Sequence, residues 1–240
     1  NTKNMSNLTS KNYIETMFNS IKRYDYEPMY FLSYEQNVCY SEILVNDIPV
    51  NKNFTEVVNG STLEINNYIF KSGTQKVTLR LYAIGKTKDF DFPTLAKDTD
   101  MKIEITEANN KNRDIKGKKI TSYVTPLEVN VDGEGYKISK FKFTGQKYVE
   151  LSFTFEAKVP YEFTSLDKAC DLSKWKKDIL KEKVVDFYKN QWDIINDKRK
   201  DDFFSYLDLK ERETCQSLFY DKDELKETLE AYLEPFVIND

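Results

Sequence analysis

The segment EILVNDIPVNKNFTEVVNGSTLEINNYIFKSGTQKVTLRLYAI, residues 42–84, decides the fold class of this chain. Near its end, Val77, Leu79 and Leu81 alternate with polar residues, so that apolar side chains point to one face of a strand. The turn before this strand contains Gly73, which can take the positive φ that tight turns require. Short strands separated by turn residues are typical of a β-sandwich and not of alternating strands and helices.

The same segment resembles the immunoglobulin-like modules of exported bacterial proteins. The resemblance lies in residues 43–49 (ILVNDIP), in Ile65 and Asn66, and in the Ser72–Gly73 pair before the alternating strand. Exported proteins of Gram-negative bacteria that join such a module to a C-terminal helical region are similar in layout. The resemblance implies an α+β fold, in which an N-terminal antiparallel, immunoglobulin-like β-sandwich precedes C-terminal helices. It assigns no functional residue.

Alternating segments continue the predicted sandwich to residue 160, and we expect a domain over residues 1–160. Asp132 and Gly133 lie between two alternating runs and predict a β-hairpin, with a bulge where the apolar phase changes between Ile138 and Phe141. Residues 149–155 alternate without a break and are expected to pair with the strand just before them. The N-terminal part of this domain is ambiguous, because the apolar spacing in residues 13–26 suits a short helix better than a strand.

Residues 161–240 predict a helical region. Apolar residues recur at intervals of three and four from Trp175 to Ile195, which predicts a long amphipathic helix, and we interpret both tryptophans as core residues. A second helical segment follows, and Asp221 with Glu224 predicts a capping box at the start of a third.

The composition excludes several kinds of chemistry. The chain has 36 Lys and Arg against 40 Asp and Glu, and residues 161–240 are the acidic part, so we expect no nucleic-acid partner. It has no histidine, which excludes Ser-His-Asp and Cys-His catalysis and zinc sites that need histidine. Cys39, Cys170 and Cys215 are far apart, and we favour three separate thiols over a disulfide with one thiol left over. We therefore expect no catalytic constellation, no cofactor and no metal ion.

Five tyrosines near the start of the chain are a candidate surface for a sugar or a peptide. Aromatic rings can stack on such ligands, but aromatic residues also pack across neighbouring strands of an ordinary sandwich, and we favour the packing interpretation. The candidate residues are Tyr24, Tyr26, Tyr30, Tyr34 and Tyr40.

These observations favour a non-catalytic binding protein of the bacterial periplasm or cell surface. A protein partner is the leading expectation, and one form is an immunity protein that binds a toxin. The alternatives are a carbohydrate-binding module, or a histidine-independent enzyme such as a glycoside hydrolase with two carboxylates. We expect no transmembrane segment. The polar start of the chain suits an exported product from which a signal, with a residue that could carry a lipid anchor, has been removed.

Overall fold

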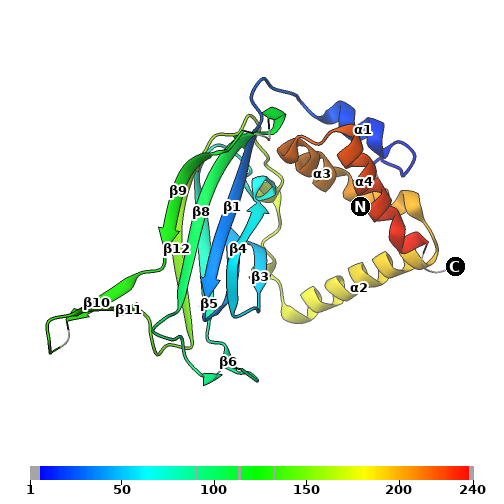
Figure 1. The fold of residues 1–240 in the computed structure, drawn as a ribbon. Coiled ribbons are helices and arrows are strands. Elements are labelled where there is room, and N and C mark those ends of the chain that lie inside the picture. Colours follow the sequence, from blue (N-terminus) through cyan, green and yellow to red (C-terminus); the bar gives the residue numbers. More distant parts are fainter. Residues whose placement is uncertain (1–5, 90, 113–114, 132, 238–240) are drawn as a thin grey trace. The chain divides into compact units, whose positions relative to one another are not determined.

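The structure is a computed structural model that describes all residues except 1–5, 90, 113–114, 132 and 238–240 (Figure 1). The chain forms two compact units. One consists of residues 25–162, and the other of residues 1–24 together with residues 163–240. The first is a β-sandwich and the second is helical, so the protein has the α+β fold class that the sequence predicts.

Two four-stranded antiparallel sheets make up the sandwich. The first sheet has the order β4-β1-β8-β9, and the second has the order β12-β5-β2-β3. The strands of the first sheet are β1 (Pro28–Asn37), β4 (Val57–Glu64), β8 (Asp100–Asn109) and β9 (Lys118–Val124). Those of the second are β2 (Tyr40–Val45), β3 (Ile48–Asn53), β5 (Gly73–Tyr82) and β12 (Tyr148–Ala157). A short hairpin of β6 (Gly85–Lys86) and β7 (Asp91–Phe92) lies in the connection from β5 to β8.

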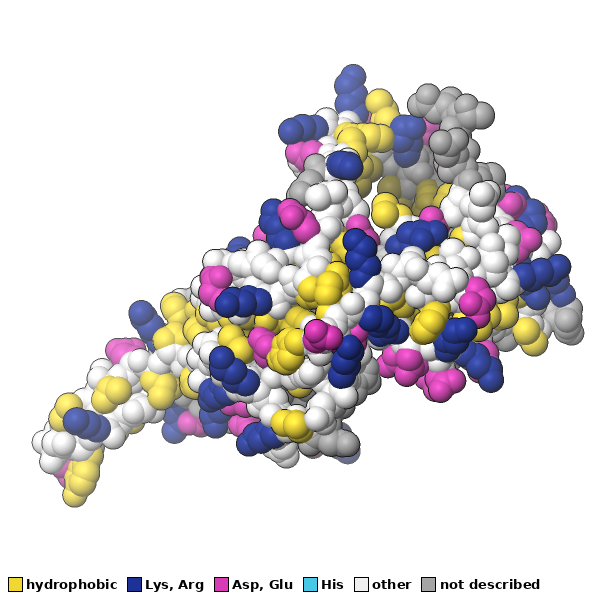
Figure 2. Space-filling view, turned by 90° about the horizontal axis from the view of Figure 1, so that it is seen from above, with side chains coloured by type: hydrophobic (Ala, Val, Ile, Leu, Met, Phe, Trp, Pro, Cys, Tyr) yellow, Lys and Arg dark blue, Asp and Glu magenta, His cyan; other side chains and the backbone are white. Residues whose placement is uncertain are grey.

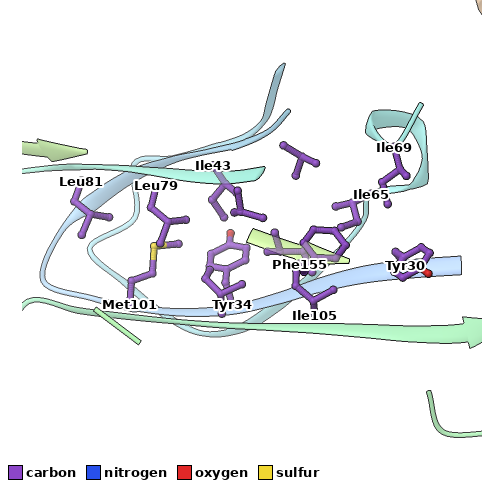
Figure 3. Packing of buried hydrophobic residues seen from close by; sticks show 14 of the residues in the cluster. Tyr30, Tyr34, Ile43, Ile65, Ile69, Leu79, Leu81, Met101, Ile105 and Phe155 are labelled. Atoms are coloured by element: carbon purple, nitrogen blue, oxygen red, sulfur yellow. The ribbon is translucent and has the colours of Figure 1, made fainter. Parts of the chain in front are cut away.

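Apolar side chains from both sheets fill the space between them (Figure 3). Leu79 and Leu81 of β5 lie near Met101 of β8, and all three are fully buried. Their period of two is the alternation seen in the sequence, and it sets which face of each strand is buried. Burial of each such side chain stabilises the sandwich by roughly 1.5–3 kcal/mol.

The pairing of the last strand differs from the expected one. β12 pairs with β5 over its whole length, from Tyr148 opposite Tyr82 to Ala157 opposite Gly73, and not with the strand just before it. The alternation in β12 shows which of its faces is buried, but it does not specify which strand pairs beside it. The burial of Val149 and Phe155 against the common core selects β5.

The predicted hairpin is present, but it lies outside the sandwich. β10 (Leu127–Val131) and β11 (Lys137–Phe141) form a separate two-stranded sheet that projects from the sandwich (Figure 1). The register between the two strands contains no shift, so the predicted bulge is wrong. The apolar phase changes because Ile138 and Phe141 lie on opposite faces of the ribbon, and only Phe141, at its base, reaches the core.

The helical unit contains α1 (Tyr13–Ser20), α2 (Lys177–Asn196), α3 (Lys200–Leu218), α4 (Lys222–Leu233) and a final turn, η5 (Glu234–Phe236). Residues 1–24 belong to this unit and not to the sandwich domain over residues 1–160 that the sequence predicts. The reason is packing, because Tyr13 and Met17 of α1 are fully buried in one cluster with Phe204 and Leu225. The predicted capping box at Asp221 is confirmed.

α2 is only partly covered. Ile194 is its one buried residue among those described, and Trp192 is 65 % exposed. Trp175 precedes the helix and is not part of it. The interpretation of Trp192 as a core residue is therefore wrong, because the apolar stripe of α2 is covered only at its C-terminal end. Among the described helices, none has the length and apolar content needed to cross a bilayer.

Candidate binding surfaces

The structure does not gather the five candidate tyrosines into one platform. Tyr30 and Tyr34 lie in the sandwich core, where the hydroxyl of the fully buried Tyr30 donates a hydrogen bond to Glu107 and accepts one from the Lys158 N–H. Burial raises the pKa of Tyr30 well above its ordinary value. These two rings have the packing role that strand aromatics usually have.

The other three tyrosines lie in different surroundings. Tyr24 belongs to the helical unit, where its ring packs edge-on against Phe219. Tyr40 packs edge-on against Phe54. Tyr26 is 49 % exposed and donates to Glu107, and its pKa is raised to about 12 by partial burial and this hydrogen bond. Only Tyr26 among them is a largely exposed ring, so the five cannot act as one stacking surface.

The projecting hairpin is the most apolar exposed element of the sandwich unit. Residues directly opposite in an antiparallel pair share a face, so Leu127, Val129 and Val131 form a stripe on one face of the ribbon, opposite Phe141, Ser139 and Lys137. The apolar side chains at the surface of the hairpin are each at least half exposed: Leu127 53 %, Val129 56 %, Val131 63 %, Tyr136 66 % and Ile138 53 %. Figure 2 shows hydrophobic atoms along this arm, at the left of the view.

The hairpin is held to the sandwich at its base and little stabilised beyond it. Phe141 is fully buried there, and its N–H donates to the Lys97 carbonyl. Along the ribbon, Glu128 and Lys140 form an ion pair across the strands, with 3.5 Å between Oε2 and Nζ. An isolated two-stranded hairpin is marginally stable in water, and each strand of this one also leaves an outer edge. The hairpin thus combines exposed apolar side chains with backbone edges that can pair.

Sequence reasoning found this hairpin but assigned it to the sandwich. The alternating pattern of residues 127–131 is the same as that of a core strand, so it could not show that the apolar face lacks a partner. One feature of the sequence could have indicated an exposed hairpin. Residues 128–142 are rich in charged and polar side chains, so the face of the ribbon opposite Leu127, Val129 and Val131 has few apolar positions.

A shallow groove lies on the outer face of the first sheet, with a volume of about 630 Å³. Hydroxyl groups of Ser33 and Thr62 bond to each other at 2.8 Å across β1 and β4. Two ion pairs flank them, Lys102 with Glu35 at 3.5 Å and Lys119 with Glu104 at 2.8 Å. The groove offers hydroxyl and charged groups to a polar ligand, and both carboxylates in it already have a lysine beside them.

The outer face of the second sheet carries a network of charges. Arg80 of β5 bonds Glu42 of β2 at 3.2 Å and Glu150 of β12 at 2.9 Å. The hydrogen bonds from Lys52 and Arg80 lower the pKa of Glu42, and those from Arg80 and Tyr148 lower that of Glu150. These pairs tie three neighbouring strands together and point to a structural role.

The helical unit contains a buried carboxylate, Glu211, which is 1 % exposed. It accepts hydrogen bonds from the hydroxyls of Tyr13 and Tyr232, each at 2.5 Å, and it pairs with the Lys210 ammonium at 3.2 Å. Burial and the bond to Glu211 raise the pKa of Tyr232 to about 12, and burial raises the pKa of Tyr13 further. Because Tyr13 lies on α1, Glu211 on α3 and Tyr232 on α4, the network fastens three helices to one another.

The cysteines are free thiols, as predicted. Cys39 and Cys215 are buried, and Cys170 is exposed. Burial raises the pKa of both buried thiols to about 12, so they are protonated and unreactive at neutral pH. Within the described part of the chain, no three acidic, cysteine or histidine side chains are close enough together to hold a metal ion.

Comparison with known proteins gives no relative: no family model, no curated protein and no solved structure matches this chain.

Proposed function

We propose that this protein is a binding protein that holds a partner protein through the β10–β11 hairpin, by pairing a free edge of the ribbon with a strand of the partner. The observation that carries the proposal is the exposed stripe of Leu127, Val129 and Val131 on a ribbon that projects from the sandwich. Contiguous exposed apolar side chains are typical of interaction sites, and strand addition supplies main-chain hydrogen bonds as well.

The apolar stripe supplies part of the free energy of binding that this role requires. Full burial of a valine or leucine gains roughly 1.5–3 kcal/mol, and about half of that remains available where the side chain is half exposed. Three such residues offer about 3 kcal/mol, to which pairing of the backbone edge adds. This gain has to exceed the cost of association, so the partner must bring further contacts.

A protein partner suits the hairpin better than a lipid bilayer does. Glu128 and Lys140 lie in the middle of the ribbon, and Glu134 lies in the turn. Insertion into hydrocarbon would remove these charges from water, which is costly, whereas a protein surface can leave them at the rim of the interface.

Site-specific photo-crosslinking in the producing cells tests the proposal. Val129 is replaced by a benzophenone amino acid in the full chain, and a matched sample carries the same group at the exposed Lys71. The expected result is a discrete protein adduct from position 129, none from position 71, and loss of the adduct when Val131→Lys is added. Adducts with lipid alone, or none at either position, would overturn the proposal.

The groove on the first sheet supports a second candidate function, carbohydrate binding. The hydroxyls of Ser33 and Thr62 and the neighbouring ion pairs resemble the polar lining that sugars require. Titration of the protein against a panel of oligosaccharides, with Thr62→Val as the comparison, tests it; equal heats for both proteins would remove this candidate.

The narrower expectations from the sequence stay predictions. An immunity-type role would use the same hairpin to occupy a toxin, and protection of cells by the wild type but not by Val129→Lys would support it. Export to the periplasm or outer membrane rests on the resemblance to exported proteins, and fractionation of cells that produce the protein from its natural gene tests it.

A further inference from the structure

The four outer edges of the two large sheets differ in how well they are protected against pairing with another strand. The pairings of β3, β4 and β9 with their neighbours each contain a register shift, and β3 also contains Pro49, which has no N–H to donate. Bulges and proline are common means by which proteins block the edge of a sheet. Three edges are therefore poor templates for another strand.

β12 is the fourth edge, and it lacks these features. It pairs with β5 over ten residues without a register shift and contains no proline. In the described part of the chain, no strand pairs with its other side. Such an edge presents a regular row of backbone N–H and C=O groups, which is the template that strand addition uses.

The side chains along β12 leave part of the core open at this edge. Leu151 and Phe153 point inward but are only partly buried, between the buried Val149 and Phe155. Tyr123 of β9 stacks on Phe153, with ring centroids 4.8 Å apart, so apolar groups line the seam between the two edge strands. A strand with apolar side chains at every second position would cover this seam.

We propose that the β12 edge accepts β10 from a second copy of this chain, which names the partner of the hairpin and rests on the proposed function. β10 places Leu127, Val129 and Val131 at every second position. In an antiparallel register with Val129 opposite Leu151, two further apolar pairs follow: Leu127 lies opposite Phe153, and Val131 lies opposite Val149.

The polar face is compatible with the same register. Glu128 lies opposite Ser152, and Asn130 lies opposite Glu150, so no like charges face each other. Glu128 keeps its ion pair with Lys140, and Glu150 keeps its bond to Arg80. A slip by one residue would turn Glu128 towards the core and the valines towards water, so the register is well specified.

Two copies can make this contact reciprocally. The hairpin is followed directly in the chain by β12, so each copy presents a donor strand and an acceptor edge close together. A twofold axis then forms both contacts at once, the commonest symmetry of protein dimers. A strand from a different protein, or a lipid surface, are the other possible occupants, and the experiment below separates them.

Disulfide trapping tests the register. In a Cys170→Ser background, which removes the exposed thiol, protein with Glu128→Cys is mixed with protein carrying Ser152→Cys and oxidised with diamide. Directly opposed residues lie about 5 Å apart, within reach of a disulfide, whereas residues displaced by two lie about 7–8 Å apart and are out of reach. The matched control is Thr154→Cys, on the same exposed face of β12.

The expected result is a cross-linked dimer that forms several-fold faster with Ser152→Cys than with Thr154→Cys. Sedimentation of the wild-type chain should show dimers that increase with concentration, and Val129→Lys should be monomeric. Leu151→Lys should also be monomeric, and a mixture of these two variants should form a heterodimer, because the intact hairpin of one fits the intact edge of the other.

Equal trapping at both positions, no trapping between the Glu128→Cys and Ser152→Cys proteins, or a wild-type chain that stays monomeric would overturn the inference. Circular dichroism melts of each variant show that it is folded, and the cysteine variants keep the test valid if Leu151→Lys does not fold. A photo-crosslink from position 129 to a different protein, without register-specific trapping, would leave the proposed function standing and remove only this inference.

Discussion

The network around Glu211 gives the sharpest prediction about stability. Tyr13→Phe removes one hydroxyl, which lies 2.5 Å from the Glu211 carboxylate, and keeps the ring. The ring's edge-on contact with Phe204, at 5.6 Å between centroids, should therefore be unchanged. The substitution isolates one hydrogen bond to a buried charge.

The magnitude follows from burial. A hydrogen bond to a charged group contributes about 1.5–3 kcal/mol, and Glu211 is too buried for water to replace the lost donor. We expect Tyr13→Phe to destabilise the helical unit by about 2 kcal/mol. For a unit of roughly 100 residues this lowers Tm by about 8–16 °C.

The assay is thermal unfolding followed by circular dichroism at 222 nm, with hydrogen exchange of α1, α3 and α4 to report on this unit alone. The matched control is Tyr26→Phe, which removes a similar bond to Glu107 at 2.6 Å, but from a side chain that is 49 % exposed. Water can replace that donor, so the control should cost less than about 1 kcal/mol. Equal effects of the two substitutions, or a cost below about 0.5 kcal/mol for Tyr13→Phe, would refute the assigned role of Glu211.

The same network predicts a loss of stability at alkaline pH. The pKa of Tyr13 in the folded unit is raised above the unfolded value of 10, so folded protein keeps a proton that the unfolded chain releases. Its contribution is complete below about pH 10 and decreases by about 1.4 kcal/mol per pH unit as the pH rises towards the folded pKa. Urea unfolding at about pH 9, 10 and 11 should show a shallower decrease for Tyr13→Phe than for the wild type, and parallel curves would contradict the argument.

Three further predictions concern separate features. Gly117→Ala should destabilise the sandwich by about 1–3 kcal/mol, because the new Cβ would lie 2.9 Å from the Glu107 carbonyl oxygen. The control is Gly133→Ala, whose new Cβ meets no atom within 4 Å, and similar melting temperatures for the two variants would show that the strands adjust freely. Asp221→Ala should cost about 0.5–2 kcal/mol and increase exchange of the first turn of α4, since it removes a capping box, and unchanged exchange there would argue against this. In native protein at neutral pH, a thiol reagent should modify Cys170 alone and should reach all three cysteines only on unfolding, as counted by mass spectrometry. Rapid modification of more than one thiol in the native protein would show that Cys39 and Cys215 are less protected than their burial indicates.

Local patterns predicted the elements of this protein well. The period of two in β5 and β12 and the period of three and four in α2 reflect how side chains are distributed around a strand and a helix, so they can be read from neighbouring residues alone. The capping box at Asp221 was predictable for the same reason, because every group in it lies within four residues.

Partners distant in the chain were not predictable in this way. β12 pairs with β5, for example through Arg80 and Glu150, which are 70 residues apart in the chain. α1 packs in the cluster of Phe204 and Leu225, which is still more distant from it in the sequence. The candidate tyrosines show the same limit, since β1 carries Tyr30 into the core while Tyr26, which precedes the strand, stays exposed, and the spacing of the tyrosines does not show this difference. The hairpin at residues 127–141 has the pattern of a core strand, and its exposure depends on the absence of a covering layer.

By itself, therefore, the sequence determined the α+β class, the strand and helix segments, and the exclusion of histidine chemistry, because these depend on composition and on neighbouring residues. The tertiary structure alone decided which segments contact one another and which stay uncovered. It placed residues 1–24 with the helices, buried Glu211, and left the edge of β12 and the strand β10 without a neighbouring layer among the described residues. The physical reason is that burial is a property of contacts between segments far apart in the chain, and an alternating pattern states that a face is apolar without stating what will cover it.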